Sequence, residues 1–90
     1  MPLNTHVLSA EIALPVSTGA ATSFSEARVV RLVNTDSSAH VVSVVATQSG
    51  TGIGSFTMPA ASVEFLEKKY AHCVFADSAT IKGSKVGFTN

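Results

Sequence analysis

The sequence predicts an all-β protein, a single small antiparallel β-sandwich or barrel of six to eight short strands, with one short helical turn near residues 70–75. Two observations lead to this prediction. Stretches rich in valine, isoleucine and phenylalanine alternate with clusters of glycine, serine, threonine, asparagine and proline, which is typical of short strands joined by turns. The chain has 90 residues, which fits one domain with a thin core.

The N-terminal part is predicted to contain one strand followed by an arm. Apolar residues recur at every second position from residue 6 to residue 14, which is the period of a strand with one buried face. Pro15 should end this strand, and the small, polar run VSTGAATSFSE favours a long surface loop or a mobile arm. We therefore divide the single domain into an N-terminal strand plus small-residue arm, 1–26, and a β-sandwich core, 27–90.

The stretch ARVVRLVNTDSSAHVVSVVA, residues 27–46, is predicted to be two strands joined by a polar turn. Both strands carry apolar side chains on both faces, so we expect the second face to be covered by a loop or by another chain. A glycine-containing turn and a third strand follow. Pro59 should stop that strand, because proline cannot donate to a ladder.

Residues 62–76 fit two periods, because their apolar side chains also fall at helical spacing behind a possible Ser62 N-cap. We prefer a strand over 63–68, with Val63 and Phe65 facing inward, because the preceding hairpin strands need a neighbour. The helical turn would follow this strand. A closing hairpin with its turn at Gly83-Ser84 is predicted to complete the fold, with three residues in the core: Ile81, Val86 and Phe88.

Charge and cysteine content argue against several classes of function. Six Lys and Arg balance six Asp and Glu, and no basic run is longer than Lys68-Lys69, so we expect no nucleic-acid partner. The sequence has no signal-peptide pattern and no apolar run of bilayer length, so we expect no membrane partner. Cys73 is the only cysteine, which rules out an internal disulfide and fits a reducing compartment.

No motif in the sequence predicts a catalytic, cofactor or metal site. Asp36, Ser37 and His40 have the residue types of a hydrolytic triad, but turn chemistry already explains the first two. The glycines at 50, 52 and 54 do not form a phosphate-binding loop, because the sequence around them has neither the strand and helix of a dinucleotide-binding motif nor the lysine of a P-loop. The histidines and Cys73 lack zinc-ligand spacing. We therefore assign no catalytic residue, no cofactor and no metal.

The charged residues are better explained as parts of an interface. Charged residues are only 13% of the chain and hydrophobic residues 46%, which leaves little charge to cover a lone surface and favours burial against other chains. The arginines beside the first hairpin strand are candidates to pair with carboxylates of a partner, and the Glu-Lys-Lys run is a candidate rim. The candidate interface residues are Arg28, Arg31, Val41, Val45, Glu67, Lys68 and Lys69.

Three runs, VVRLVNTDSSAHVVSVV, IGSFTMPAASVEFLEKK and VFADSATIKGSKVGFTN, together resemble small virion proteins of tailed bacteriophages, especially those of marine cyanophages. The resemblance covers residues 28–90 and rests on structural motifs. It implies a β-sandwich used in particle assembly, such as a capsid decoration or cement protein, or a small tail or neck component. The implied partners are the major capsid protein or other virion proteins and further copies of itself, and the implied location is the virion, assembled in the host cytoplasm.

Two alternatives remain at this stage. The first alternative is a tail, neck or host-attachment module that binds a glycan. The sequence counts against it, because the chain has no tryptophan and a single tyrosine, Tyr70, to stack on sugars. A small hydrolase that uses His40 or His72 ranks last. The resemblance carries over no active-site residue to either alternative.

Overall fold

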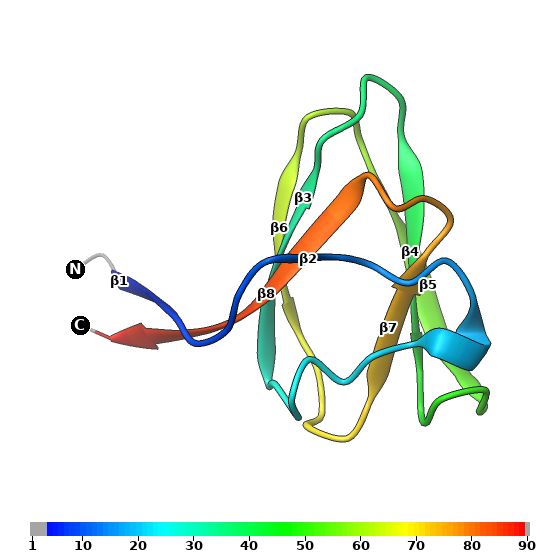
Figure 1. The fold of residues 1–90 in the computed structure, drawn as a ribbon, viewed down its shortest axis with the longest axis horizontal. Coiled ribbons are helices and arrows are strands. Elements are labelled where there is room, and N and C mark those ends of the chain that lie inside the picture. Colours follow the sequence, from blue (N-terminus) through cyan, green and yellow to red (C-terminus); the bar gives the residue numbers. More distant parts are fainter. Residues whose placement is uncertain (1–3, 90) are drawn as a thin grey trace.

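The computed structural model describes residues 4–89, which form two antiparallel sheets that face each other (Figure 1). The all-β prediction is confirmed, and the architecture is a sandwich. Residues 1–3 and 90, which the predicted segments 1–26 and 27–90 include, lie outside the described residues. The elements in chain order are β1 (Asn4–Val7), β2 (Ile12–Ala13), the 3₁₀ turn η1 (Thr18–Ala20), β3 (Val29–Asn34), β4 (His40–Val45), β5 (Gly52–Met58), β6 (Val63–Glu67), β7 (Cys73–Ala76) and β8 (Ile81–Thr89).

The two sheets differ in size. The larger sheet has the order β1-β8-β3-β6, with β2 also paired to β8, and the smaller sheet has the order β5-β4-β7. Where the two sheets face each other, alternate residues of a strand point into the space between them, as the pleat requires. The fully buried members of the resulting core include Leu14, Val30, Leu32, Val42, Met58, Val74 and Ile81.

The predicted strand over residues 6–14 is in fact two short strands. β1 and β2 pair with successive parts of β8, and the chain leaves the ladder between them. Within this break the Leu8 amide donates to the Lys85 carbonyl, and the Lys85 amide donates to the Ser9 hydroxyl. Alternation along the sequence could not reveal this break, because polar Ser9 fits the outward half of a continuous strand equally well.

The small-residue segment after Pro15 is packed along the sandwich. Thr22 forms a two-way backbone bridge with Val74 of β7, and Phe24 is buried in the core. Together with the pairing of β1 and β2, these contacts make the N-terminal part of the chain a component of the same sandwich.

Two predictions for the C-terminal third are wrong. In place of a helical turn near residues 70–75, a turn at 70–71 leads directly into β7. In place of a hairpin at Gly83-Ser84, β8 is one continuous strand of nine residues that pairs with β3 through this same dipeptide. Gly83 faces the core, where a side chain would collide with Phe24, so the glycine satisfies a packing constraint and makes no turn.

The inward face of β6 is also opposite to the prediction. Leu66 pairs with buried Val30 and lies on the core side, whereas Phe65 pairs with Arg31 on the outer side. Val63 shares the outer side with Phe65. The prediction failed because both alternating sets in this strand contain apolar residues, so period two could not distinguish them. Phe88, predicted to be in the core, is also exposed, whereas Ile81 and Val86 are buried as predicted.

The larger sheet extends beyond the body of the sandwich. β1 and the last part of β8 form a two-stranded ribbon that projects from the body and carries both ends of the described chain (Figure 1). The ribbon gives the molecule a longest dimension of 37 Å.

We predict that Gly83→Ala destabilises the protein. A methyl group at this position would lie 2.8 Å from the Phe24 ring and 3.0 Å from both Leu14 and Leu32. Overpacking of this kind costs about 1–3 kcal/mol, measurable as a lower urea midpoint in circular dichroism. Gly54→Ala in β5 is the control, because nothing lies within 4 Å of its added methyl. Equal effects of the two substitutions would contradict the proposed crowding at Gly83.

Candidate interaction surface

The outer face of the larger sheet carries an uncovered group of apolar side chains. Phe65 is 46% exposed and Val63 is 44% exposed, both on β6. The Phe88 ring of β8 lies 5.3 Å from the Phe65 ring, centroid to centroid, at an angle of 59°. This tilted geometry is favourable for an aromatic pair. We call these three residues the phenylalanine patch.

Arg31 lies beside this patch and is held by its own chain. Its guanidinium Nη1 is 3.5 Å from Oε2 of Glu11, which precedes β2. Because β8 lies between β3 and β2, the ion pair spans that strand, and Ser84, directly opposite Arg31 in the ladder, is buried. Both charged side chains are partly exposed, so the pair stabilises the fold by less than about 1 kcal/mol. The Arg31 side chain therefore lies partly exposed at the edge of the patch, and its weak ion pair with Glu11 would not prevent contact with a partner.

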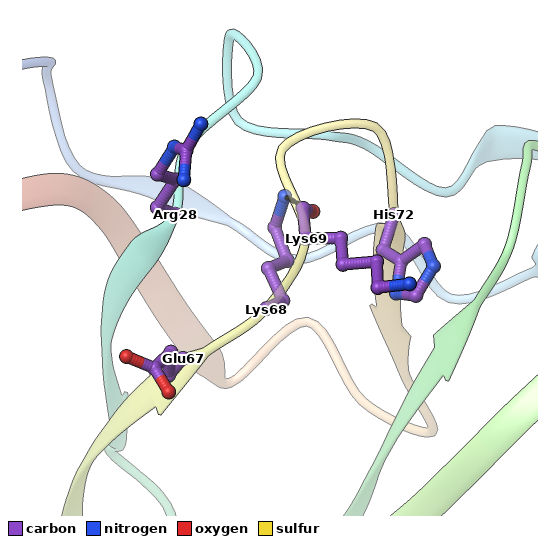
Figure 2. A pocket seen from close by; sticks show the side chains of 5 residues that line it. All are labelled: Arg28, Glu67, Lys68, Lys69 and His72. Carbon is purple, nitrogen blue, oxygen red and sulfur yellow. Dashed lines mark hydrogen bonds between the residues drawn. The ribbon is translucent and has the colours of Figure 1, made fainter.

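At one end of the sandwich, a hollow of about 420 Å³ brings together four of the seven predicted interface residues. It is lined by Arg28, Glu67, Lys68 and Lys69, and by His72, which sequence reasoning did not select as an interface residue (Figure 2). Arg28 precedes β3, while the lysines follow β6. The sequence could not indicate that these two segments meet, because that depends on the pairing of β3 with β6. We call this site the basic hollow.

Lys68 differs from the exposed rim charge that the sequence suggested, because it is only 8% exposed. Its Nζ donates to the Ala27 carbonyl at 2.8 Å and lies 3.4 Å from the carbonyls of Lys69 and Tyr70. Burial is the main reason that the pKa of Lys68 is lowered, and nearby Lys85 acts in the same direction. Lys68 thus ties the β6–β7 loop to the segment that precedes β3.

That segment contains a left-handed turn. Phe24, Ser25 and Glu26 are consecutive non-glycine residues with φ between 54° and 58°. Left-handed backbone costs roughly 1–2 kcal/mol per residue, so the turn must be held from outside. The Ser23 hydroxyl accepts from the Glu26 amide and the Ser23 carbonyl accepts from the Ala27 amide. The Lys85 ammonium donates to the Ser25 carbonyl. With the buried Phe24 ring, these contacts fix the start of β3 and the position of Arg28.

The two valines predicted to form a second interface face have different surroundings. Val45 is 5% exposed, because Ala21 of the N-terminal segment covers it together with Cys73 and Phe75. Its face is therefore closed by a loop of the same chain. Val41 is 38% exposed and remains at the surface. A shallow groove of about 350 Å³ also crosses the outer face of β4 and β5. Phe75 is the one aromatic residue among those that line it.

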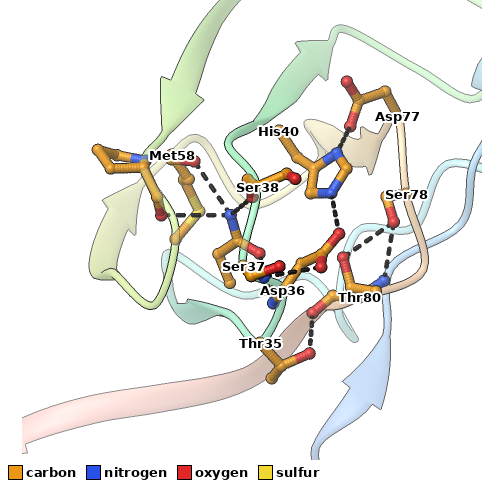
Figure 3. A network of polar contacts seen from close by, with 11 residues as sticks. Thr35, Asp36, Ser37, Ser38, His40, Met58, Asp77, Ser78 and Thr80 are labelled. Atoms are coloured by element: carbon orange, nitrogen blue, oxygen red, sulfur yellow. Dashed lines mark hydrogen bonds and ion pairs between the residues drawn. The ribbon is translucent and has the colours of Figure 1, made fainter.

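The opposite end of the sandwich contains a histidine between two carboxylates (Figure 3). His40 Nε2 is 2.7 Å from Asp36 Oδ2, and Nδ1 is 3.0 Å from Asp77 Oδ1. The hydrogen bond between Asp36 and His40 is the largest cause of the raised pKa of His40 and of the lowered pKa of Asp36. Since both ring nitrogens already face carboxylates, neither is free to take a proton from Ser37, and this group is not arranged as a hydrolytic triad.

Asn34 organises the same end and was missed by sequence reasoning. The side chain is fully buried, and its Nδ2 lies 3.0 Å from the Ser38 carbonyl, 3.1 Å from that of Met58 and 3.2 Å from that of Pro59. Its Oδ1 accepts from the Asp36 amide. One amide side chain therefore joins the end of β3 to the end of β5 in the other sheet.

Within the range 4–89, no group of three or more His, Cys, Asp or Glu side chains is placed to hold a metal ion. The described part of the chain also has no helix with the length and apolar character needed to cross a membrane.

Comparison with known proteins leaves this small β-sandwich without an assigned family. No protein-family model, no curated protein and no solved structure matches the chain.

We predict a pH dependence of stability that is due to His40. Because its pKa is raised above the ordinary value of 6.5, its ion pairs stabilise the fold fully below that value, and the stabilisation is lost as the pH rises through the raised pKa. The lowered pKa of Asp36 has the opposite sign, so its contribution is present above 3.8 and is lost as the pH falls through the lowered pKa.

Urea unfolding at about pH 5.5 and about pH 8.5 measures the His40 effect, since the first value lies below and the second above the ordinary histidine pKa. We expect the free energy of unfolding to fall more for the natural protein than for the His40→Gln variant when the pH rises from the lower to the higher value. The other histidines are present in both proteins, so their contributions cancel in the comparison. Identical losses in both proteins would contradict the role of His40.

We predict that Asn34→Asp is one of the most damaging isosteric substitutions in the chain. It replaces a buried donor with an oxygen that faces three carbonyls, which costs about 3 kcal/mol or more. Thr35→Val is the control, because the lost hydroxyl bond to Thr80 is exposed and its loss costs less than about 1.5 kcal/mol. Thermal unfolding of both variants tests the difference, and a mild effect of Asn34→Asp would rule out the amide as a lock between the sheets.

Proposed function

We propose that this protein is a non-enzymatic structural component of a phage particle, a decoration or cement protein that bridges shell subunits. The observation that carries the proposal is the phenylalanine patch on the outer face of the larger sheet. Exposed aromatic side chains on a sheet face are typical anchors of protein interfaces.

Several properties of the chain support a role in assembly. Charged residues make up only 13% of the sequence, so little charge surrounds the apolar side chains that remain at the surface. β3, β8 and β6 hold the patch on a hydrogen-bonded sheet, so little order is lost when a partner covers it. The projecting β1–β8 ribbon adds exposed Val7, and exposed Leu8 follows it where the chain meets the body of the sandwich.

The proposed attachment depends on many copies of the protein binding to one particle. A patch of this size supplies modest affinity per copy, but a particle presents many equivalent sites, and simultaneous contacts with neighbouring subunits raise the overall strength of attachment. The proposed partners are the major capsid protein or another virion protein together with further copies of this chain. The likeness of three sequence runs to small phage virion proteins supports this setting, and the virion is the proposed location.

We predict that Phe65→Asp prevents association without unfolding the monomer. A carboxylate in the patch would have to be desolvated on contact, so association should weaken by at least roughly tenfold. Sedimentation velocity over a concentration series measures this weakening for self-association. Ile53→Asp is a matched control, because Ile53 is an exposed apolar residue on the other sheet. If both variants associate as the natural protein does, the patch is not the interface.

The particle itself provides the second measurement. Mass spectrometry of purified particles should find the natural chain and Ile53→Asp in many copies, and Phe65→Asp in far fewer. Absence of the natural chain from purified particles would reject the proposed function.

A further inference from the structure

We propose that the basic hollow binds a carboxylate side chain of the partner protein and so orients the partner on the phenylalanine patch. This inference rests on the proposed function, since it assumes that the partner is a protein that covers the larger sheet. The two sites are continuous, because Glu67 is the last residue of β6 and lies two positions after Phe65 on the same outer face.

The charges that line the basic hollow are not balanced within the described residues. None of Arg28, Lys68 and Lys69 forms an ion pair with a carboxylate in residues 4–89. Carbonyl groups satisfy the hydrogen-bonding capacity of Lys68 without neutralising its charge. Glu67 is the single carboxylate among the five lining residues. The hollow therefore has a positive excess that an incoming anion would neutralise.

The basic side chains line the hollow from two segments of the chain. Figure 2 shows Arg28 on one side of the hollow, Lys69 and His72 on the other, and Lys68 between them. The carbonyl contacts hold Lys68 in place, and the left-handed turn fixes the segment that carries Arg28. The site is thus largely formed before a ligand arrives, which reduces the ordering required on binding.

A carboxylate is the anionic group that a protein partner supplies. Its single negative charge can be neutralised by the hollow even though Glu67 at the rim cancels part of the positive charge. A carboxylate also matches the planar guanidinium of Arg28, which binds two oxygens side by side. A glutamate or aspartate on a partner that already covers Phe65 meets both conditions.

The test uses hexaglutamate as the probe and the natural chain at low ionic strength. Titration followed by two-dimensional NMR should shift the resonances of Arg28, Lys69 and His72 in a saturable way, and added salt should weaken the binding. The double variant Arg28→Ala/Lys69→Ala should bind hexaglutamate at least roughly tenfold more weakly. Lys82→Ala is the control, because that lysine lies near the other end of β3 and should leave binding unchanged.

Two outcomes would overturn the inference. Shifts spread evenly over all the lysines, Lys82 included, would mean general attraction to a polyanion. Saturation of the same resonances by inorganic phosphate at lower concentration than hexaglutamate would make the hollow a phosphate site.

Particle incorporation separates this inference from the proposed function. If hexaglutamate fails to bind while Phe65→Asp still prevents incorporation, the carboxylate site is rejected and the assembly role stands. If hexaglutamate binds but Phe65→Asp is incorporated normally, the hollow is an anion site and the partner does not use the phenylalanine patch.

Discussion

The arrangement of the two sheets depends on the amide of Asn34. Its Nδ2 serves the carbonyls of Met58 and Pro59, where β5 ends, although Asn34 itself ends β3 in the opposite sheet. Buried carbonyls need donors, and an asparagine at this point supplies them without introducing a charge. Asp36 continues the network through its amide to Asn34 and through its carboxylate to His40. The His40 ring also contacts Asp77, which follows β7, so three loops at this end are connected by polar contacts.

The other end of the sandwich is held by lysines. Lys68 and Lys85 donate to carbonyls of the left-handed segment at Ala27 and Ser25, which keeps a costly backbone conformation in place. A domain of this size has a thin core, so polar contacts outside the core add to its stability. Polar contacts at both ends hold the sandwich together without the Phe65 side chain, which is half exposed on the outer face of the larger sheet.

The sequence predicted those parts of the fold that depend on local pattern. β3 and β4 were identified because valines occupy alternate positions on both sides of a polar turn. Gly83-Ser84 was mistaken for a turn, because a glycine required by a crowded core looks the same in sequence as a turn glycine. Long-range partners were not predictable at all. Nothing near Lys68 in the sequence indicates that its ammonium binds the Ala27 carbonyl, and nothing near Asn34 points to Met58.

The phenylalanine patch and the basic hollow would contribute different properties to one interface. Fully burying a phenylalanine side chain contributes about 1.5–3 kcal/mol, and Phe65 is already half covered, so it would contribute part of this. An exposed ion pair contributes about 0.2–1 kcal/mol, so the charges add little affinity by comparison. Apolar contact has no preferred direction, whereas a carboxylate paired with the planar guanidinium of Arg28 is satisfied in few orientations of the partner. Affinity would therefore come chiefly from the sheet face, and the register of the partner from the hollow at its edge.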